Sequence, residues 1–242
     1  MSILKKTLLA TVVVATGASV QAEVSANIGV TSDYIWRGVS QSSEAASVSG
    51  GVDYSSDSGF YAGTWVGSLG DNGSGFAGSE VDLYFGYGGE IGQVGLGYDV
   101  GYIYYHYPTA EGDFGEIYAS VGGDIFSGGF AYTVNDGDID GEDNVLFASG
   151  DLYLYVSAGV DLSDTWTAGA TIGSYLFDAD GDVIGGVEVD ADYVFYQVDF
   201  GKSTDLGDFT ISLIGTDIDI DGPSSGQGVD DIKAVVSWGI GF

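Results

Sequence analysis

Apolar residues recur at every second position over long stretches of the chain. Between Asp151 and Asp161 every even-numbered residue is apolar, whereas the odd-numbered ones are polar, small or tyrosine. The same alternation runs through residues 165–172 and 80–87. Because successive side chains of a β-strand point to opposite faces of its sheet, this spacing predicts strands with one apolar and one polar face.

About twelve segments predict strands by this pattern and by the turns that bound them. They are residues 24–36, 46–55, 60–68, 79–89, 94–107, 114–125, 129–135, 150–162, 165–176, 187–202, 208–217 and 230–242. The connections alternate between short turns and mostly longer polar loops, which is typical of outer-membrane barrels and has no reason in a soluble sandwich. We therefore predict an all-β protein, a single transmembrane antiparallel up-and-down β-barrel of about 12 strands.

Two of these segments fit the alternation poorly. In 187–202 the apolar positions change phase near Asp192, which favours a β-bulge. Segment 129–135 is short, and its strand could continue into the following loop.

The first 22 residues have the features of a secretory signal peptide. Lys5 and Lys6 precede a mostly apolar stretch, and Val20-Gln21-Ala22 matches a small-x-small cleavage site. That stretch is too short to cross a bilayer as a helix. We predict a signal peptide at 1–22 and an outer-membrane β-barrel at 23–242. An exported chain of this kind can cross the bacterial outer membrane and contact its lipid only as a closed barrel, because closure pairs every backbone group internally.

The chain is strongly acidic, with 36 Asp and Glu against 5 Lys and Arg, and a formal net charge of −31. A nucleic-acid partner is disfavoured, because such proteins need Lys and Arg against the phosphates. The absence of cysteine excludes disulfides and thiolate metal sites. The 42 Gly, 17 Tyr and only 2 Pro are unlike a linker and fit closely packed strands with aromatic rings at the membrane interface.

The C-terminal residues from Ile232 to Phe242 alternate in the same way and end on an aromatic ring. This ending resembles the closing strand of bacterial outer-membrane proteins. The resemblance implies that the barrel assembly machinery recognises Phe242. The alternation alone indicates only a strand with two different faces.

Several sequence motifs lie in the N-terminal part of the chain. They are SANIGV at 25–30, SDYIWRGVSQ at 32–41, GGVDY at 50–54 and GFYAGTW at 59–65, followed more weakly by EVDLYFGY at 80–87 and YP at 107–108. Together they resemble the Gcw_chp (TorF-type) family, proteobacterial outer-membrane proteins of unknown function that are regarded as porins. The resemblance implies an outer-membrane barrel and a pore, and it carries no substrate and no catalytic residues.

One set of charged residues falls on the predicted inner face of the strands. These predicted pore-lining residues are Asp33, Arg37, Glu80, Asp82, Asp99 and Glu116. Arg37 among so many acids is either a constriction charge that sorts solutes or part of a lumen salt-bridge network. The network is the favoured interpretation, and both need Arg37 to be paired.

Aromatic residues gather near the predicted strand ends and predict girdles at the two membrane interfaces. The outer girdle would contain Tyr34, Trp36, Tyr102 and Tyr104, and the inner one Trp166, Trp238 and Phe242.

Two predicted external loops contain the pattern D-x-D-x-D-G. Its acids are Asp136, Asp138 and Asp140 in one loop and Asp217, Asp219 and Asp221 in the other. This spacing resembles the start of a calcium loop, which also needs a Glu at its twelfth position. That position holds Phe147 or Gly228, so solvated acidic loops are the favoured interpretation and Ca²⁺ binding is the alternative. No other cofactor is indicated.

The function expected from these observations is a porin-like channel for passive passage of ions or small polar solutes. An acidic lumen favours small cations. The alternative is a non-conducting structural or adhesive barrel that acts through its acidic, calcium-binding loops. We do not expect an enzyme, because the single histidine, His106, has no serine close in sequence and the chain lacks a G-x-S-x-G motif.

Overall fold

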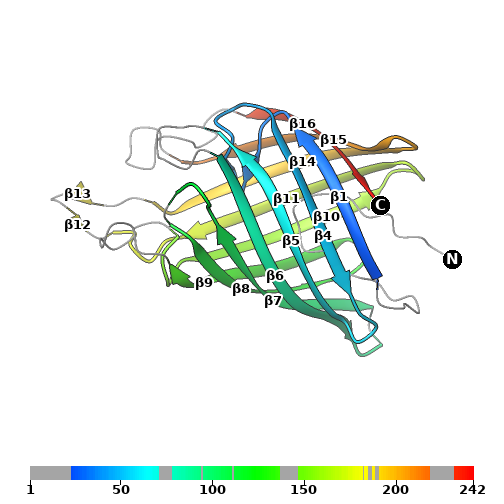
Figure 1. Cartoon of the computed structure of the whole chain (residues 1–242), viewed down its shortest axis with the longest axis horizontal. Coiled ribbons are helices and arrows are strands. Elements are labelled where there is room, and N and C mark those ends of the chain that lie inside the picture. Colours follow the sequence, from blue (N-terminus) through cyan, green and yellow to red (C-terminus); the bar gives the residue numbers. More distant parts are fainter. Residues whose placement is uncertain are drawn as a thin grey trace.

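Twelve antiparallel strands close into one barrel in the computed structural model (Figure 1). The structure describes residues 23–70, 78–93, 95–110, 112–136, 147–181, 183–184, 187–188, 191–218 and 232–242. The barrel strands are Glu23–Thr31 (β1), Ser47–Ser55 (β4), Phe60–Leu69 (β5), Gly78–Ile91 (β6), Leu96–His106 (β7), Phe114–Gly122 (β8), Phe126–Asp136 (β9), Leu152–Asp161 (β10), Trp166–Leu176 (β11), Tyr193–Thr204 (β14), Gly207–Thr216 (β15) and Lys233–Gly241 (β16).

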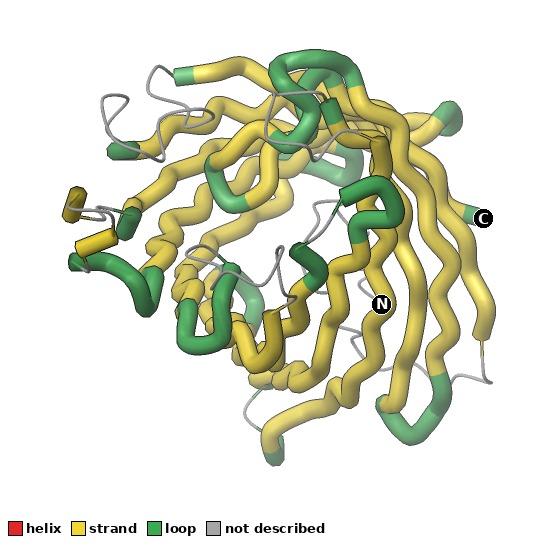
Figure 2. Tube along the Cα trace, turned by 60° about the vertical axis from the view of Figure 1, so that its left-hand side comes forward, coloured by secondary structure: helices red, strands yellow, loops and turns green. Residues whose placement is uncertain are grey.

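Each barrel strand pairs with the next one along the chain, and β16 returns to pair with β1. Two short hairpins stand apart from the barrel sheet, Ile35–Trp36 (β2) with Val39–Ser40 (β3) and Val183–Ile184 (β12) with Val187–Glu188 (β13). The predicted all-β up-and-down barrel is confirmed, and the ring of strands is seen obliquely in Figure 2.

The two ends of the barrel differ. β1 begins and β16 ends at the same end, whereas the hairpin of β12 and β13 lies at the opposite end (Figure 1). In outer-membrane barrels the termini and short turns are periplasmic and the longer loops are external. The end with β12 and β13 is therefore the external end.

Burial across the sheet is the reverse of that in a soluble protein. Val156 and Ile172, on the outer face, each remain 56% exposed, whereas Asp99 and Glu116 are 2% and 1% exposed. Hydrocarbon covers such an apolar outer face in a membrane, so the charged groups are the ones that must turn inward. The protein is thus an outer-membrane barrel whose polar face encloses the lumen, as the alternation predicts.

No helix long and apolar enough to cross a bilayer occurs in the described part of the chain. Residues 1–22, the predicted signal peptide, lie outside the described residues.

Three predicted strands need correction. The segment 24–36 is wrong as a single strand, because β1 ends at Thr31 and the chain then turns into the lumen. The predicted bulge near Asp192 is also wrong, because β14 begins at Tyr193 and pairs with β15 without a break, while 187–188 belong to a separate hairpin. The predicted segment 129–135 is too short, because β9 runs from Phe126 to Asp136. The strand that contains a bulge is β9. Gly115 pairs with Asn135 but Glu116 with Thr133, which leaves one extra residue on β9.

Candidate functional site in the barrel lumen

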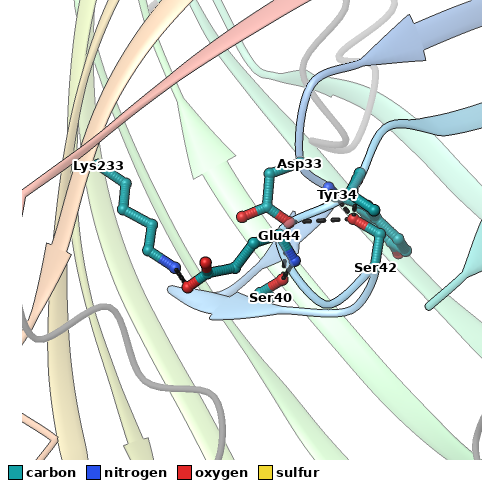
Figure 3. A network of polar contacts seen from close by, with 7 residues as sticks. Asp33, Tyr34, Ser40, Ser42, Glu44 and Lys233 are labelled. Carbon is teal, nitrogen blue, oxygen red and sulfur yellow. Dashed lines mark hydrogen bonds and ion pairs between the residues drawn. The ribbon is translucent and has the colours of Figure 1, made fainter. Parts of the chain in front are cut away.

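Residues 32–46, here called the inserted segment, connect β1 to β4 and fold into the barrel. Asp33 organises its start, since its Oδ1 accepts hydrogen bonds from the hydroxyls of Ser40 at 2.7 Å and Ser42 at 3.0 Å (Figure 3). The Ser42 hydroxyl oxygen also accepts a bond from the backbone NH of Tyr34 at 2.8 Å. These contacts close residues 33–42 on themselves around the β2–β3 hairpin, so the segment enters the lumen as a folded unit.

The tip of the hairpin is a tight turn with two left-handed residues. Arg37 has φ 48° and Gly38 has φ 87°. A Cβ on Gly38 would lie 2.6 Å from the Thr216 methyl carbon and 2.7 Å from the Phe195 Cβ. The backbone therefore approaches β14 and β15 too closely for a side chain, and glycine is required there. The left-handed conformation of Arg37 costs about 1–2 kcal/mol, which its side-chain contacts must offset.

The Arg37 side chain reaches the wall opposite its own connection. Its two terminal nitrogens donate to the two carboxylate oxygens of Glu116, Nη1 to Oε1 at 2.7 Å and Nη2 to Oε2 at 2.6 Å. In the ring of strands, β8 with Glu116 lies far from β1 and β4, where the inserted segment starts and ends. Both side chains are buried, Arg37 at 11% and Glu116 at 1% exposed. The segment therefore crosses the lumen.

Aromatic rings surround the Arg37 guanidinium. Its central carbon lies 4.1 Å from the Trp36 ring centroid, 4.2 Å from Tyr153 and 5.3 Å from Tyr175. Trp36 itself contacts the rings of Tyr105, Phe114, Phe147 and Tyr175 at centroid distances of 5.6–6.3 Å. The predicted outer girdle is therefore wrong for Trp36, which packs inside the barrel against β7, β8 and β11.

The rest of the inserted segment contacts other parts of the wall. The Tyr34 hydroxyl donates to Glu80 Oε1 on β6 at 2.8 Å, and its ring packs 5.3 Å from that of Trp65 on β5. Tyr34 thus also lies inside and not in an outer girdle. Glu44 forms an ion pair with Lys233 at the start of β16 (Figure 3), and this ammonium lowers the pKa of the Glu44 carboxyl. The segment therefore meets strands on several sides of the ring.

The predicted pore-lining acids lie on the inner side of the wall or in the inserted segment. All five of these acids are buried, namely Asp33, Glu80, Asp82, Asp99 and Glu116. Neutral hydroxyls hold several of them. Glu80 accepts from Tyr34 and from Tyr107, and Asp99 accepts from Tyr61 at 2.7 Å. Such donors satisfy oxygen atoms but do not cancel charge, so only Glu116 among these wall acids pairs with a cation in the described residues.

Asp82 differs from its neighbours. It is 7% exposed, and its Oδ1 is buried without a hydrogen-bond partner among the described residues. It lies close enough to Glu80 and Glu116 to interact with both electrostatically. Glu80, Asp82 and Glu116 thus form one acidic group beside the tip of the inserted segment, while Asp99 lies apart with Tyr61.

The lumen holds functional candidates that the strand phases missed. Asp199 on β14 is 5% exposed and accepts hydrogen bonds from Ser212 at 2.6 Å and Gln197 at 2.8 Å. Its apolar neighbours Val198 and Phe200 already alternate with it in the sequence, and that signal could have placed it inside. Three tyrosines surround Arg37 and Glu116, namely Tyr105, Tyr153 and Tyr175. The sequence contains 17 tyrosines, and these three can be recognised only once the position of the inserted segment is known.

The predicted calcium residues are only partly within the described structure. Asp136 ends β9 and Asp217 follows β15, where its Oδ1 accepts from the backbone NH of Val194 at 2.6 Å. Asp138, Asp140, Asp219 and Asp221 lie outside the described residues. Within the described ranges no group of three or more His, Cys, Asp or Glu side chains is placed to hold a metal ion. Calcium at these loops stays a prediction.

His106 lies at the external end of β7. Its Nδ1 is 2.6 Å from Asp113 Oδ2, which also accepts from the Tyr104 hydroxyl at 2.9 Å. Burial works to raise the pKa of Asp113, but hydrogen bonds from the Tyr107 backbone NH, His106 and Tyr104 outweigh it and lower that pKa. The Asp113 carboxylate therefore stays charged. It links the two ends of the connection between β7 and β8, so its role is structural.

Comparison with known proteins agrees with this architecture. A family model described as bacterial protein of unknown function, Gcw_chp, matches residues 15–238. The chain belongs to the Gcw_chp family. This Gcw_chp protein is similar in fold to the NanC porin, with 11% identity, a TM-score of 0.50 and coverage of 90% of this chain and 98% of that one. It is also similar to an outer-membrane channel from Pseudomonas putida F1, with 9% identity, a TM-score of 0.52 and coverage of 93% and 97%. A search among curated proteins finds no match.

Proposed function

We propose that this protein is a porin-like channel that passes ions or small polar solutes and prefers cations. The observation that carries the proposal is the inner wall, where carboxylates outnumber cationic groups. In the described residues, Asp53, Glu80, Asp82, Asp99, Glu116 and Asp199 belong to the wall, against Lys233 from β16 and Arg37 from the inserted segment. Rings of carboxylates raise the local concentration of cations and repel anions.

The size of the barrel supports passage. About eight strands enclose a space that side chains fill, so twelve leave more room. Many inward positions carry no side chain, and Gly51, Gly159 and Gly169 are examples on three different strands. The inserted segment contacts Glu80 and Glu116, so a constriction at this segment would lie beside these acids.

Planar-bilayer recording in a KCl gradient tests this proposal. We expect a cation-selective reversal potential that weakens as salt rises, because the Debye length falls from about 30 Å at 0.01 M to about 3 Å at 1 M. The double variant Glu80→Gln/Asp82→Asn should lose part of the selectivity, and Arg37→Ala should increase it or change the conductance.

The matched control neutralises two exposed acids in turns, Asp164→Asn between β10 and β11 and Asp205→Asn between β14 and β15. This variant should keep the wild-type reversal potential. Repeated insertions of folded barrels without conductance would overturn the channel proposal. An anion-selective pore would show that the wall carboxylates do not set the selectivity.

A second candidate is the non-conducting structural or adhesive barrel that acts through its external loops. The observation that favours it is the inserted segment, which joins opposite walls through Arg37 and Glu116 and packs Trp36 against several strands. Absence of conductance in well-folded protein would support this candidate.

Calcium provides a separate test of the loop-based candidate. We expect millimolar Ca²⁺ to shift the thermal midpoint no further than NaCl of equal ionic strength, because the twelfth-position glutamate of a calcium loop is missing. A larger Ca²⁺ shift that shrinks in the triple variant Asp217→Asn/Asp219→Asn/Asp221→Asn would contradict this expectation, since a bound ligand stabilises the folded state. The control triple Asp57→Asn/Asp161→Asn/Asp164→Asn removes acids outside the two D-x-D-x-D-G loops.

A further inference from the structure

Several side chains of the barrel wall hold the guanidinium group of Arg37. Glu116 accepts from both terminal nitrogens of Arg37 at 2.7 and 2.6 Å, and the ring of Tyr153 lies 4.2 Å from the guanidinium carbon. The Tyr105 hydroxyl donates to Glu116 Oε2 at 3.1 Å and fixes the carboxylate in place. Tyr175 closes another side at 5.3 Å. We call Tyr105, Glu116, Tyr153 and Tyr175 the wall site.

The geometry of the wall site selects one chemical group. A planar fork of two N–H donors matches both oxygens of a carboxylate, and a flat delocalised cation stacks on aromatic faces. An ammonium is a compact point charge that cannot form the paired contact, and a neutral planar urea group lacks the charge. The wall site therefore favours guanidinium over both.

The group that fills the wall site does not belong to the wall. The four residues of the wall site lie on four barrel strands: Tyr105 on β7, Glu116 on β8, Tyr153 on β10 and Tyr175 on β11. Arg37 instead lies at the tip of the inserted segment. The wall site would keep its shape if Arg37 left, because paired barrel strands hold all four residues.

A neighbouring acidic side chain offers a further hydrogen-bond acceptor. Asp82 is 7% exposed, its Oδ1 has no hydrogen-bond partner among the described residues, and it lies within electrostatic range of Glu116. A buried oxygen acceptor without a donor is costly, and an N–H donor beside it removes that cost. An incoming solute thus meets the unsatisfied Asp82 oxygen close to Glu116, the residue that Arg37 binds.

We propose that the wall site binds guanidinium-bearing solutes, with arginine as the simplest probe, as they cross the lumen, and that Arg37 fills the site when no solute is present. The proposal rests on the channel function and names its solute class. A side chain tethered nearby competes with free solute at an effective concentration of about millimolar for a flexible link and more for a folded one, so millimolar arginine is the lowest level at which displacement of Arg37 is expected.

Removing the internal competitor gives the sharpest test. In detergent, the thermal midpoint of Arg37→Ala should rise with millimolar arginine, because a ligand that binds the folded state stabilises it. Lysine carries the same charge on an ammonium and citrulline has a neutral planar end, so at equal ionic strength both should give much smaller shifts. Adding Glu116→Gln to Arg37→Ala should abolish the arginine shift. Equal shifts with arginine and lysine, or an arginine shift that survives Glu116→Gln, would overturn the proposal.

Wild-type protein carries the same test if Arg37→Ala does not fold. Displacement of Arg37 moves the tip of the inserted segment, which also carries Trp36, so arginine should change the tryptophan fluorescence and Trp36→Phe should remove that change. No arginine-specific change would overturn the proposal. Binding without conductance would count against the channel alone, whereas conductance without any preference for arginine over lysine in binding would count against the wall site alone.

Discussion

Replacing Glu116 by glutamine should lower the free energy of unfolding by about 3–5 kcal/mol, because it leaves the buried charge of Arg37 without its partner. Arg37 and Glu116 are 11% and 1% exposed, so water screens neither of them. The guanidinium would keep its rings but lose both charged hydrogen bonds. The conductance should rise in the same variant, since the bond that holds the inserted segment to the far wall is gone.

A double-mutant cycle separates the pair from its surroundings. Urea unfolding in lipid vesicles is measured for wild type, Glu116→Gln, Arg37→Ala and the double variant. The double variant should lose less than the sum of the single changes, because it leaves no unpaired charge. A loss below about 1 kcal/mol for Glu116→Gln, the level of a solvated surface pair, together with wild-type conductance would contradict the buried bond.

Ile172→Arg on the outer face of β11 should destabilise the barrel by about 2–4 kcal/mol if the residue lies near the bilayer midplane. Ile172 is 56% exposed and points away from the lumen, so the new charge would enter hydrocarbon. Its pairing partners Val156 and Tyr196 are on the same face, and neither offers a compensating charge. Folding into vesicles, followed by urea titration, measures the loss.

The matched control is the adjacent inward residue. Thr171 faces the lumen, where its hydroxyl pairs with that of Ser157 at 2.8 Å, and Gly169, two residues before it, leaves space on the inner face. Thr171→Arg should therefore cost less than Ile172→Arg, since an arginine there meets an acidic, hydrated wall. Leu154→Arg, also on the outer face, should destabilise the barrel by an amount similar to Ile172→Arg. Equal losses on the two faces would show that the assignment of faces is wrong.

The barrel wall could be predicted from sequence because its rule is local. Each strand needs only alternation between a lipid face and a lumen face, and Asp151–Asp161 or Glu80–Tyr87 show it without reference to any other segment. The same rule placed Glu80, Asp82, Asp99 and Glu116 on the inner face. It failed where one predicted strand covers parts of two elements, as in 187–202, which includes β13 and then β14.

The inserted segment could not be predicted in this way, because its position depends on distant partners. Residues 32–36 continue the alternation of β1 closely enough to read as the same strand. The chain turns inward because Arg37 adopts a left-handed conformation and bonds to Glu116, which lies 79 residues further on. Neither the conformation nor the partner has a local sequence signal, so the wall site around Arg37 emerges only in three dimensions.

The pairing of β1 with β16 also determines how such a molecule can assemble. The hydroxyls of Thr31 and Ser237, 3.0 Å apart across this seam, are separated by 206 residues, so the seam carries the largest loop-closure entropy in the fold. Until the last strand arrives, β1 and the preceding strand present two rows of unpaired amides that hydrocarbon cannot solvate. Insertion must therefore be a late, all-or-none event with a high barrier. A chain that stops before β16 would therefore not insert into the membrane at all. The loss would be far larger than the stability contributed by one strand.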